Sequence, residues 1–122
     1  MRNKLLLLLL LFSSHVAAQE EEQWTCGADS ASGFVFRNGD WQATRFINED
    51  ALFTLDGDKG IVEFSQSINV LDCKTSEAHL YCNNDSQNFI LDKASGRAGF
   101  SSLMGALIQS SSFISLFQCI RM

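Results

Sequence analysis

The sequence lacks the short motifs that mark the common enzyme classes. It contains no G-x-S-x-G, H-E-x-x-H, G-x-x-x-x-G-K or G-x-G-x-x-G string, and such strings place a nucleophile, a zinc site or a phosphate-binding loop. Proline is absent, and histidine occurs only as His15 and His79. We therefore expect a non-enzymatic protein and predict no catalytic residue, cofactor or metal.

Basic side chains are also few. Lys and Arg number 9 against 14 Asp and Glu, which gives a net charge of −5 and argues against nucleic acid as a partner. The 46% hydrophobic content and ten Phe argue against a disordered chain. A length of 122 residues limits the protein to one compact domain.

No apolar run is long enough to cross a membrane. The longest, Leu5 to Phe12, follows a cationic start at Met1 to Lys4 and precedes the small residues Val16 to Ala18, which is typical of a cleavable signal peptide. We predict a signal peptide over residues 1–18 and a soluble protein exported to the periplasm or the extracellular space, with no stable membrane insertion after cleavage.

The segment 19–23 is acidic and polar, QEEEQ. Such a segment has little to pack, so we predict a disordered leader here. Residues 24–122 are then expected to form a single β-rich domain.

All four cysteines, Cys26, Cys73, Cys82 and Cys119, lie after the predicted signal peptide. An even number in an exported chain favours disulfides, with three connectivities open. We prefer Cys73 with Cys82 across a hairpin that turns near residues 76–79, and Cys26 with Cys119 joining the chain ends. A zinc site is the alternative, but the sequence has no C-x-x-C pair.

The strongest local signal is Asn38-Gly39, which suits a type I′ hairpin turn between two short strands. This turn sets Phe36 opposite Trp41 and predicts one core-facing side that carries Phe34, Phe36, Trp41 and Ala43.

Similar signals predict hairpins over 51–64, 67–82 and 88–100, with Gly96 in the left-handed conformation. Residues 101–108 fit a strand or a helix, and we favour a strand. Residues 113–120 are apolar on both faces and predict a buried closing strand. The sum is an all-β fold of about eight short strands, a small antiparallel barrel or bent sheet stapled by disulfides.

A set of spaced residues runs through most of this domain: Trp24-x-Cys26, Gly33-Phe34-x-Phe36, Trp41-x-x-Thr44-x-Phe46, Cys73 and Cys82, Asn88-Phe89, Asp92-Lys93, Gly96-Arg97 and Cys119. This pattern resembles small secreted proteobacterial proteins of unknown activity. The resemblance implies a bacterial exported origin and gives no catalytic or binding residue.

Few side chains suggest a specific chemistry. His79 is expected in an exposed turn, and Glu49, Asp50 and Asp40 are candidate acids for glycosidase-like work, which we interpret as solvated surface groups. Asp56 to Gly60 has the start of a calcium loop but not its sixth-position glycine, so an ordinary turn is favoured. Asn84-Asp85-Ser86 matches a glycosylation acceptor that we interpret as a loop.

Trp24 is the one residue singled out for possible surface recognition, because it follows a polar segment. Our leading hypothesis is a non-enzymatic domain that binds a ligand or protein of the cell envelope. One alternative is an inhibitor of a basic envelope-attacking enzyme such as lysozyme, towards which acidic charge would steer it. Another is a small hydrolase using surface acids or His79, and a third is an assembly protein that pairs its C-terminal strand with another chain.

Overall fold

The computed structural model describes residues 21–122, so the predicted signal peptide, residues 1–18, lies outside the described residues. In chain order its elements are β1 (Glu22–Arg37), β2 (Asp40–Arg45), β3 (Ala51–Asp56), β4 (Lys59–Phe64), β5 (Ser67–Thr75), β6 (His79–Asn83), β7 (Gln87–Asp92), β8 (Arg97–Ser102), α2 (Met104–Ile108) and β9 (Ser111–Arg121).

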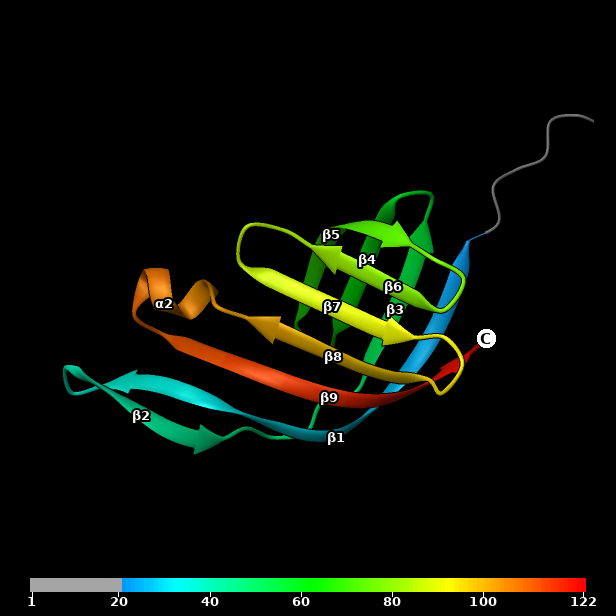
Figure 1. Ribbon diagram of the computed structural model, residues 1–122. Coiled ribbons are helices and arrows are strands. Elements are labelled where there is room, and N and C mark those ends of the chain that lie inside the picture. The colour runs from blue at the N-terminus through cyan, green and yellow to red at the C-terminus, as the bar shows by residue number, and fades with distance from the viewer. Residues whose placement is uncertain (1–20) are drawn as a thin grey trace, which may run out of the picture.

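Eight strands close an antiparallel barrel, which confirms the all-β prediction. The long β1 pairs with β3 along one edge and with β9 along the other, so the order β3 to β9 returns to β1. The ninth strand, β2, pairs with the far half of β1 alone and projects beyond the barrel (Figure 1).

Local turn chemistry explains most of the hairpins. Asn38 and Gly39 both have positive φ, 54° and 77°, as a type I′ turn requires, and Arg37 faces Asp40. Gly96 also has a φ of 77°, as expected. The hairpin that contains Cys73 and Cys82 turns between Thr75 and His79, within the predicted range.

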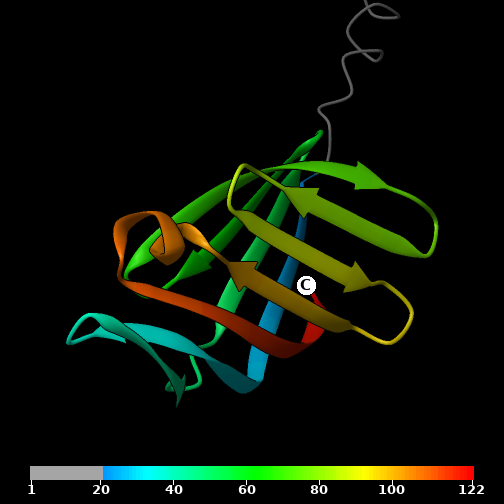
Figure 2. The same cartoon turned by 60° about the vertical axis from the view of Figure 1, so that its left-hand side comes forward.

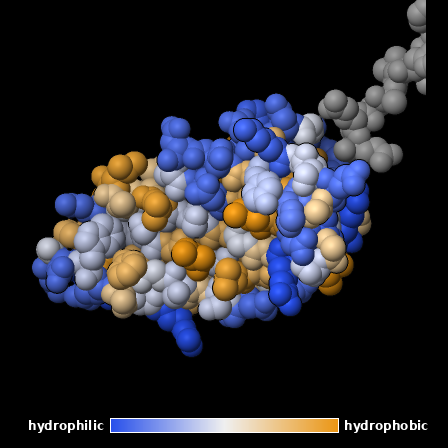
Figure 3. All heavy atoms as spheres, viewed as in Figure 1, coloured by the Kyte–Doolittle hydropathy of each residue, from blue (hydrophilic) through white to orange (hydrophobic). Residues whose placement is uncertain are grey.

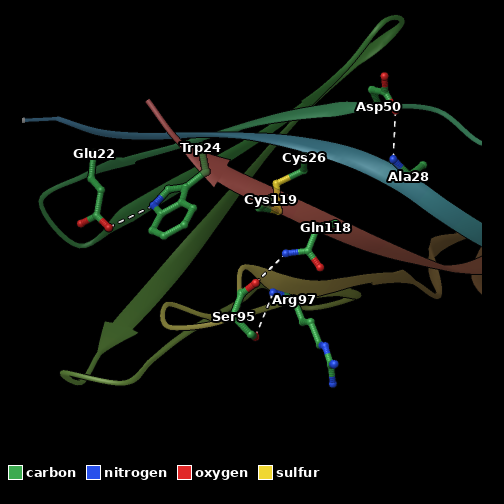
Figure 4. Close-up of a disulfide and its surroundings, with 9 residues drawn as sticks. All are labelled: Glu22, Trp24, Cys26, Ala28, Asp50, Ser95, Arg97, Gln118 and Cys119. Carbon is green, nitrogen blue, oxygen red and sulfur yellow. Dashed lines mark hydrogen bonds between the residues drawn. A yellow bond between two sulfur atoms is a disulfide. The ribbon is translucent and has the colours of Figure 1, made fainter.

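The two predicted disulfides are present. Each joins residues that face each other directly on paired strands, Cys26 with Cys119 on β1 and β9, and Cys73 with Cys82 on β5 and β6. Figure 4 shows the first bond where β1 and β9 run side by side. All four thiols are consumed, so the alternative zinc site is wrong.

The core fills the barrel towards one end, which we call the closed end. It carries both disulfides and the turns at 57–58, 76–78 and 93–96. Phe53 and Phe89 stack there with ring centroids 4.5 Å apart, and both are fully buried. The opposite end, the mouth, carries the turn at 65–66, the loop at 84–86 and α2.

Two sequence predictions about the start of the domain are wrong. The face of the first hairpin is not core: Phe34 is 52% and Trp41 39% exposed, because this part of the hairpin extends past the barrel. The predicted Phe36–Trp41 pair does form, edge to face at 5.2 Å. Glu22 and Gln23 are not a disordered leader, since they pair with Leu55 and Thr54 in β3.

The segment after β8 is helical rather than a strand. β9 pairs directly with β8, so the barrel needs no further strand, and the chain passes from Ser102 to Ser111 through α2. β9 itself is half-exposed, because barrel closure turns alternate residues outward; Ile114 and Leu116 are 55% and 53% exposed. The prediction of a strand buried on both faces is therefore also wrong.

Candidate functional site

The mouth contains two adjoining hollows of about 370 Å³ and 260 Å³. Four residues line both of them, Phe64, Ser67, Ser111 and Phe113. The first hollow extends towards Phe46, Ile47 and Glu49, and the second extends beneath α2. In Figures 1 and 2, α2 lies at this end of the barrel, beside the start of β9.

A chain of phenyl rings forms the apolar lining. Phe46 packs against Phe113 at 5.6 Å between centroids, Phe113 against Phe100 at 6.0 Å, and Phe100 against Phe64 at 5.3 Å. These rings come from four separate segments of the chain, and of the four only Phe100 is fully enclosed. A continuous aromatic surface thus faces the hollows.

Amides and hydroxyls complete the lining of the second hollow. Gln87 Nε2 donates to Asn69 Oδ1 at 2.8 Å, and Asn69 Nδ2 donates to the Val62 carbonyl at 3.2 Å. Asn84 Nδ2 donates to Gln87 Oε1 at 2.9 Å and so holds that side chain from the loop. The strands thereby position polar groups beside the rings before any ligand arrives.

Among residues 21–122, Glu49 is the only charged residue that lines either hollow. Its Oε1 accepts hydrogen bonds from the Ser65 backbone N–H at 2.7 Å and from the Ser65 hydroxyl at 2.5 Å. These bonds fix the carboxylate beside the β4–β5 turn. The first hollow therefore has one anionic group at its rim and an aromatic wall.

α2 covers the second hollow closely. Gly105 approaches the Ser111 backbone so nearly that a Cβ at this position would overlap it, and Met104 and Ile108 line the hollow. The helix ends at Ile108, the next residue, Gln109, has a φ of 51°, and the Ser110 N–H donates to the Gly105 carbonyl. The short helix is thus seated on the start of β9.

Trp24 lies elsewhere. Its side chain is 5% exposed, and its indole N–H donates to Glu22 Oε1 at 3.0 Å (Figure 4). Because the ring belongs to the core at the closed end, the predicted surface-recognition role is wrong.

His79 also lies at the closed end, exposed as expected. Its Nε2 is 3.7 Å from Asp92 Oδ1, while the Ser95 hydroxyl donates to Asp92 Oδ2 at 2.5 Å. The serine therefore contacts the acid and not the histidine, whereas nucleophile activation requires a serine hydrogen-bonded to the base.

The remaining candidate residues take structural positions. Asp50 accepts from the Ala28 N–H at 2.9 Å, and Asp40 accepts from the Trp41 N–H at 2.8 Å. Lys59, in the expected turn region, pairs with Asp72. Within residues 21–122, His, Cys, Asp and Glu side chains form no group of three or more placed to hold a metal ion.

Sequence reasoning missed the mouth. Its residues are dispersed over segments near 46–49, 64–69, 84–87, 100–105 and 110–115, and no single segment has a recognisable motif. The one sequence feature that could have indicated the mouth is the run Ser110 to Ser112, which precedes an apolar strand.

Comparison with protein-family models, curated proteins and solved structures found no match to this chain. The resemblance to secreted proteobacterial proteins therefore stays a prediction. No helix in the described part of the chain reaches the length and apolarity needed to cross a membrane. The fold and the mouth together define a disulfide-stapled β-barrel with an amphipathic hollow at one end.

Proposed function

We propose that this chain is an exported, non-enzymatic binding protein of the cell envelope, and that its ligand occupies the mouth of the barrel. The observation that carries the proposal is the pair of joined hollows, with phenyl rings on one side and amides and hydroxyls on the other. Small-molecule sites typically combine a concave apolar wall with a few fixed polar groups, and barrel mouths are a frequent place for them.

The lining indicates the chemistry of the ligand. An apolar or aromatic body would pack on Phe64 and Phe113, while hydroxyl, carbonyl or amide groups would exchange hydrogen bonds with Ser67 and Asn69. Glu49 disfavours an anionic group and favours a neutral or cationic one. We therefore propose a small, neutral or cationic amphipathic molecule.

Two disulfides support the proposed location. Structural disulfides persist mainly in oxidising compartments, such as the bacterial periplasm and the extracellular space. Together with the predicted signal peptide, they support export.

Binding can be measured with N-phenyl-1-naphthylamine, a neutral amphipathic dye whose fluorescence rises in apolar sites. Saturable binding to the oxidised protein is expected, and Ser67→Phe should weaken it at least tenfold by filling the hollow that Ser67 lines. The matched control is Ser101→Phe, on β8 opposite Ile114 and outside both hollows. It adds the same ring to the outer surface of the barrel and should leave the dissociation constant unchanged.

Equal effects of the two substitutions, or binding that does not saturate, would contradict the proposed site. The same oxidised protein tests the two alternative functions. Inhibition of lysozyme at low salt would favour the inhibitor hypothesis, and turnover of envelope polysaccharides or esters that His79→Ala abolishes would favour the hydrolase hypothesis. Of the residues that these two alternatives name, only Glu49 lines the mouth.

A further inference from the structure

β2 is the one strand of the described sheet with a neighbour on a single side. It pairs with β1 over Ser32 to Arg37, and its other edge has no partner strand within residues 21–122. In both Figures 1 and 2 it lies at the outer margin of the molecule. β9, the strand that the sequence suggested for pairing with another chain, is already paired with β1 and β8, so that earlier hypothesis has no edge to use.

The two-residue turn determines which backbone groups of β2 are free. Arg37 and Asp40 flank the turn and form the first hydrogen-bonded pair, so Gln42 and Thr44 also bond to β1. The backbone N–H and C=O groups of Trp41, Ala43 and Arg45 therefore point outward. The Asp40 carboxylate accepts from the Trp41 N–H at 2.8 Å, and the Thr44 hydroxyl donates to the Arg45 carbonyl at 3.4 Å.

Ala43 is thus the centre of the open edge, because no side chain competes for its backbone groups in the described residues. Exposed edge strands are commonly protected by charged residues. β2 carries its charges at its two ends, Asp40 and Arg45, and is neutral between them. A partner strand must therefore be neutral opposite the centre of β2, and it must carry a residue that interacts favourably with Arg45.

The sequence of β2, DWQATR, supplies that match to itself. In an antiparallel pair centred on Ala43, Trp41 of each copy lies directly opposite Arg45 of the other. The side chains of Trp41, Ala43 and Arg45 share one face of the strand, so each guanidinium can lie over an indole ring, a favourable cation–π arrangement. On the other face Gln42 meets Thr44 of the second copy, which permits a hydrogen bond.

We propose that two copies of this chain associate through their β2 strands, which pair antiparallel about a two-fold axis at Ala43. The pairing continues the β1–β2 sheet from one barrel into the next. The paired residues, 41–45, line neither hollow of the mouth, so the proposal stands independently of the proposed ligand site.

A cysteine placed on the axis gives the sharpest test. The Ala43 Cα atoms of the two copies would lie about 5.5 Å apart as a hydrogen-bonded pair, within the range that a disulfide spans. Ala43→Cys should therefore form a covalent dimer under mild oxidation. Gln42→Cys is the matched control, because residue 42 is also exposed but its Cα atoms in the two copies would be beyond the roughly 7 Å limit. Peptide mapping confirms that both native disulfides remain.

Sedimentation velocity on the uncrosslinked protein tests the pair chemistry. Arg45→Glu should raise the dimer dissociation constant at least tenfold, and the double variant Trp41→Arg with Arg45→Glu should restore most of the affinity by forming an ion pair. Asp40→Ala should lower the dissociation constant severalfold, because it frees the Trp41 N–H. Circular dichroism checks that each variant is folded.

A monomer at every concentration up to about 100 µM, which corresponds to negligible affinity for a specific dimer, would overturn the proposal. Equal crosslinking through Gln42→Cys and Ala43→Cys would also overturn it. So would a dimer that none of the β2 substitutions affects, since the contact would then lie elsewhere.

Discussion

At the closed end of the barrel, both disulfides and the stacked rings of Phe53 and Phe89 lie inside the sheet. At the mouth, four phenyl rings line hollows that solvent reaches. Phe53 and Phe89 are fully buried, whereas Phe46 and Phe113 are only partly so. The same strands form both ends, but only at the closed end do side chains fill the interior of the barrel. Stability is therefore concentrated at the end away from the proposed ligand.

Charge is divided in a similar way. In the described part of the chain, two ion pairs lie at the closed end, Lys59 with Asp72 and Arg121 with Glu22 at 4.0 Å, and His79 lies beside Asp92 there. Residues 98–120, which supply α2 and much of the mouth, contain no charged side chain. Figure 3 shows hydrophobic atoms over α2 at the upper left and across the middle of that face. The mouth is thus suited to an amphipathic ligand, whereas the surface of the closed end is suited to contact with water.

The disulfides should give the largest difference between variants. Replacing Cys26 and Cys119 with alanine opens a loop of 93 residues and should lower the free energy of unfolding by roughly 4–5 kcal/mol. Replacing Cys73 and Cys82 opens a loop of 9 residues and should lower it by roughly 2.5–3 kcal/mol. Urea denaturation of both double variants measures this, and equal losses would contradict the loop-length explanation.

Gly60 tests how tightly the closed end is packed. A Cβ there would lie 3.0 Å from Phe53 Cε1 and 3.1 Å from Cys82 Sγ, and closer still to Cys73 Sγ. Gly60→Ala should therefore destabilise the protein by about 1–3 kcal/mol through overpacking. Gly99→Ala is the matched control, because its Cβ would meet Leu116 at an ordinary 3.6 Å. A Gly60→Ala variant as stable as Gly99→Ala would show that the disulfide can move aside.

A pair of conservative ring substitutions compares the two ends directly. Phe53→Leu removes a fully buried, stacked ring and should destabilise the protein by about 1–1.5 kcal/mol. Phe46→Leu, at the partly exposed mouth, should cost about 0.5 kcal/mol or less while weakening dye binding. Thermal and urea denaturation measure the first effect and fluorescence the second. A larger stability loss for Phe46→Leu would reverse the assignment of the stable end.

The closed end was largely predictable from sequence, and the mouth was not. Asn38-Gly39, Gly96 and the cysteine spacing act through near neighbours, so hairpins and disulfides follow from local turn geometry. The inward face of the first hairpin depends on how β1 meets β9, a contact between residues far apart in sequence. The mouth depends on the same closure, because its rings come from four segments. No local sequence pattern predicts that these four segments come together.

Asp92 provides the smallest expected effect and a test of the charged end. The Ser95 hydroxyl, which donates to the carboxylate, and then His79 hold the pKa of Asp92 below its ordinary value of 3.8. The folded state therefore binds this proton less readily than the unfolded state does. The resulting stabilisation is present above about pH 3.8 and is lost as the pH falls through the lower folded pKa.

Asp92→Asn should accordingly be slightly less stable than the natural sequence at neutral pH, and this difference should shrink as the pH falls below 3.8. Ser95→Ala should act in the same direction, because it removes the principal donor to the carboxylate. Urea midpoints at a series of pH values between neutral and strongly acidic measure both variants. A stability difference that stays constant over this range would mean that Asp92 acts through the geometry of the β7–β8 turn, and that the charge of its carboxylate does not contribute to stability.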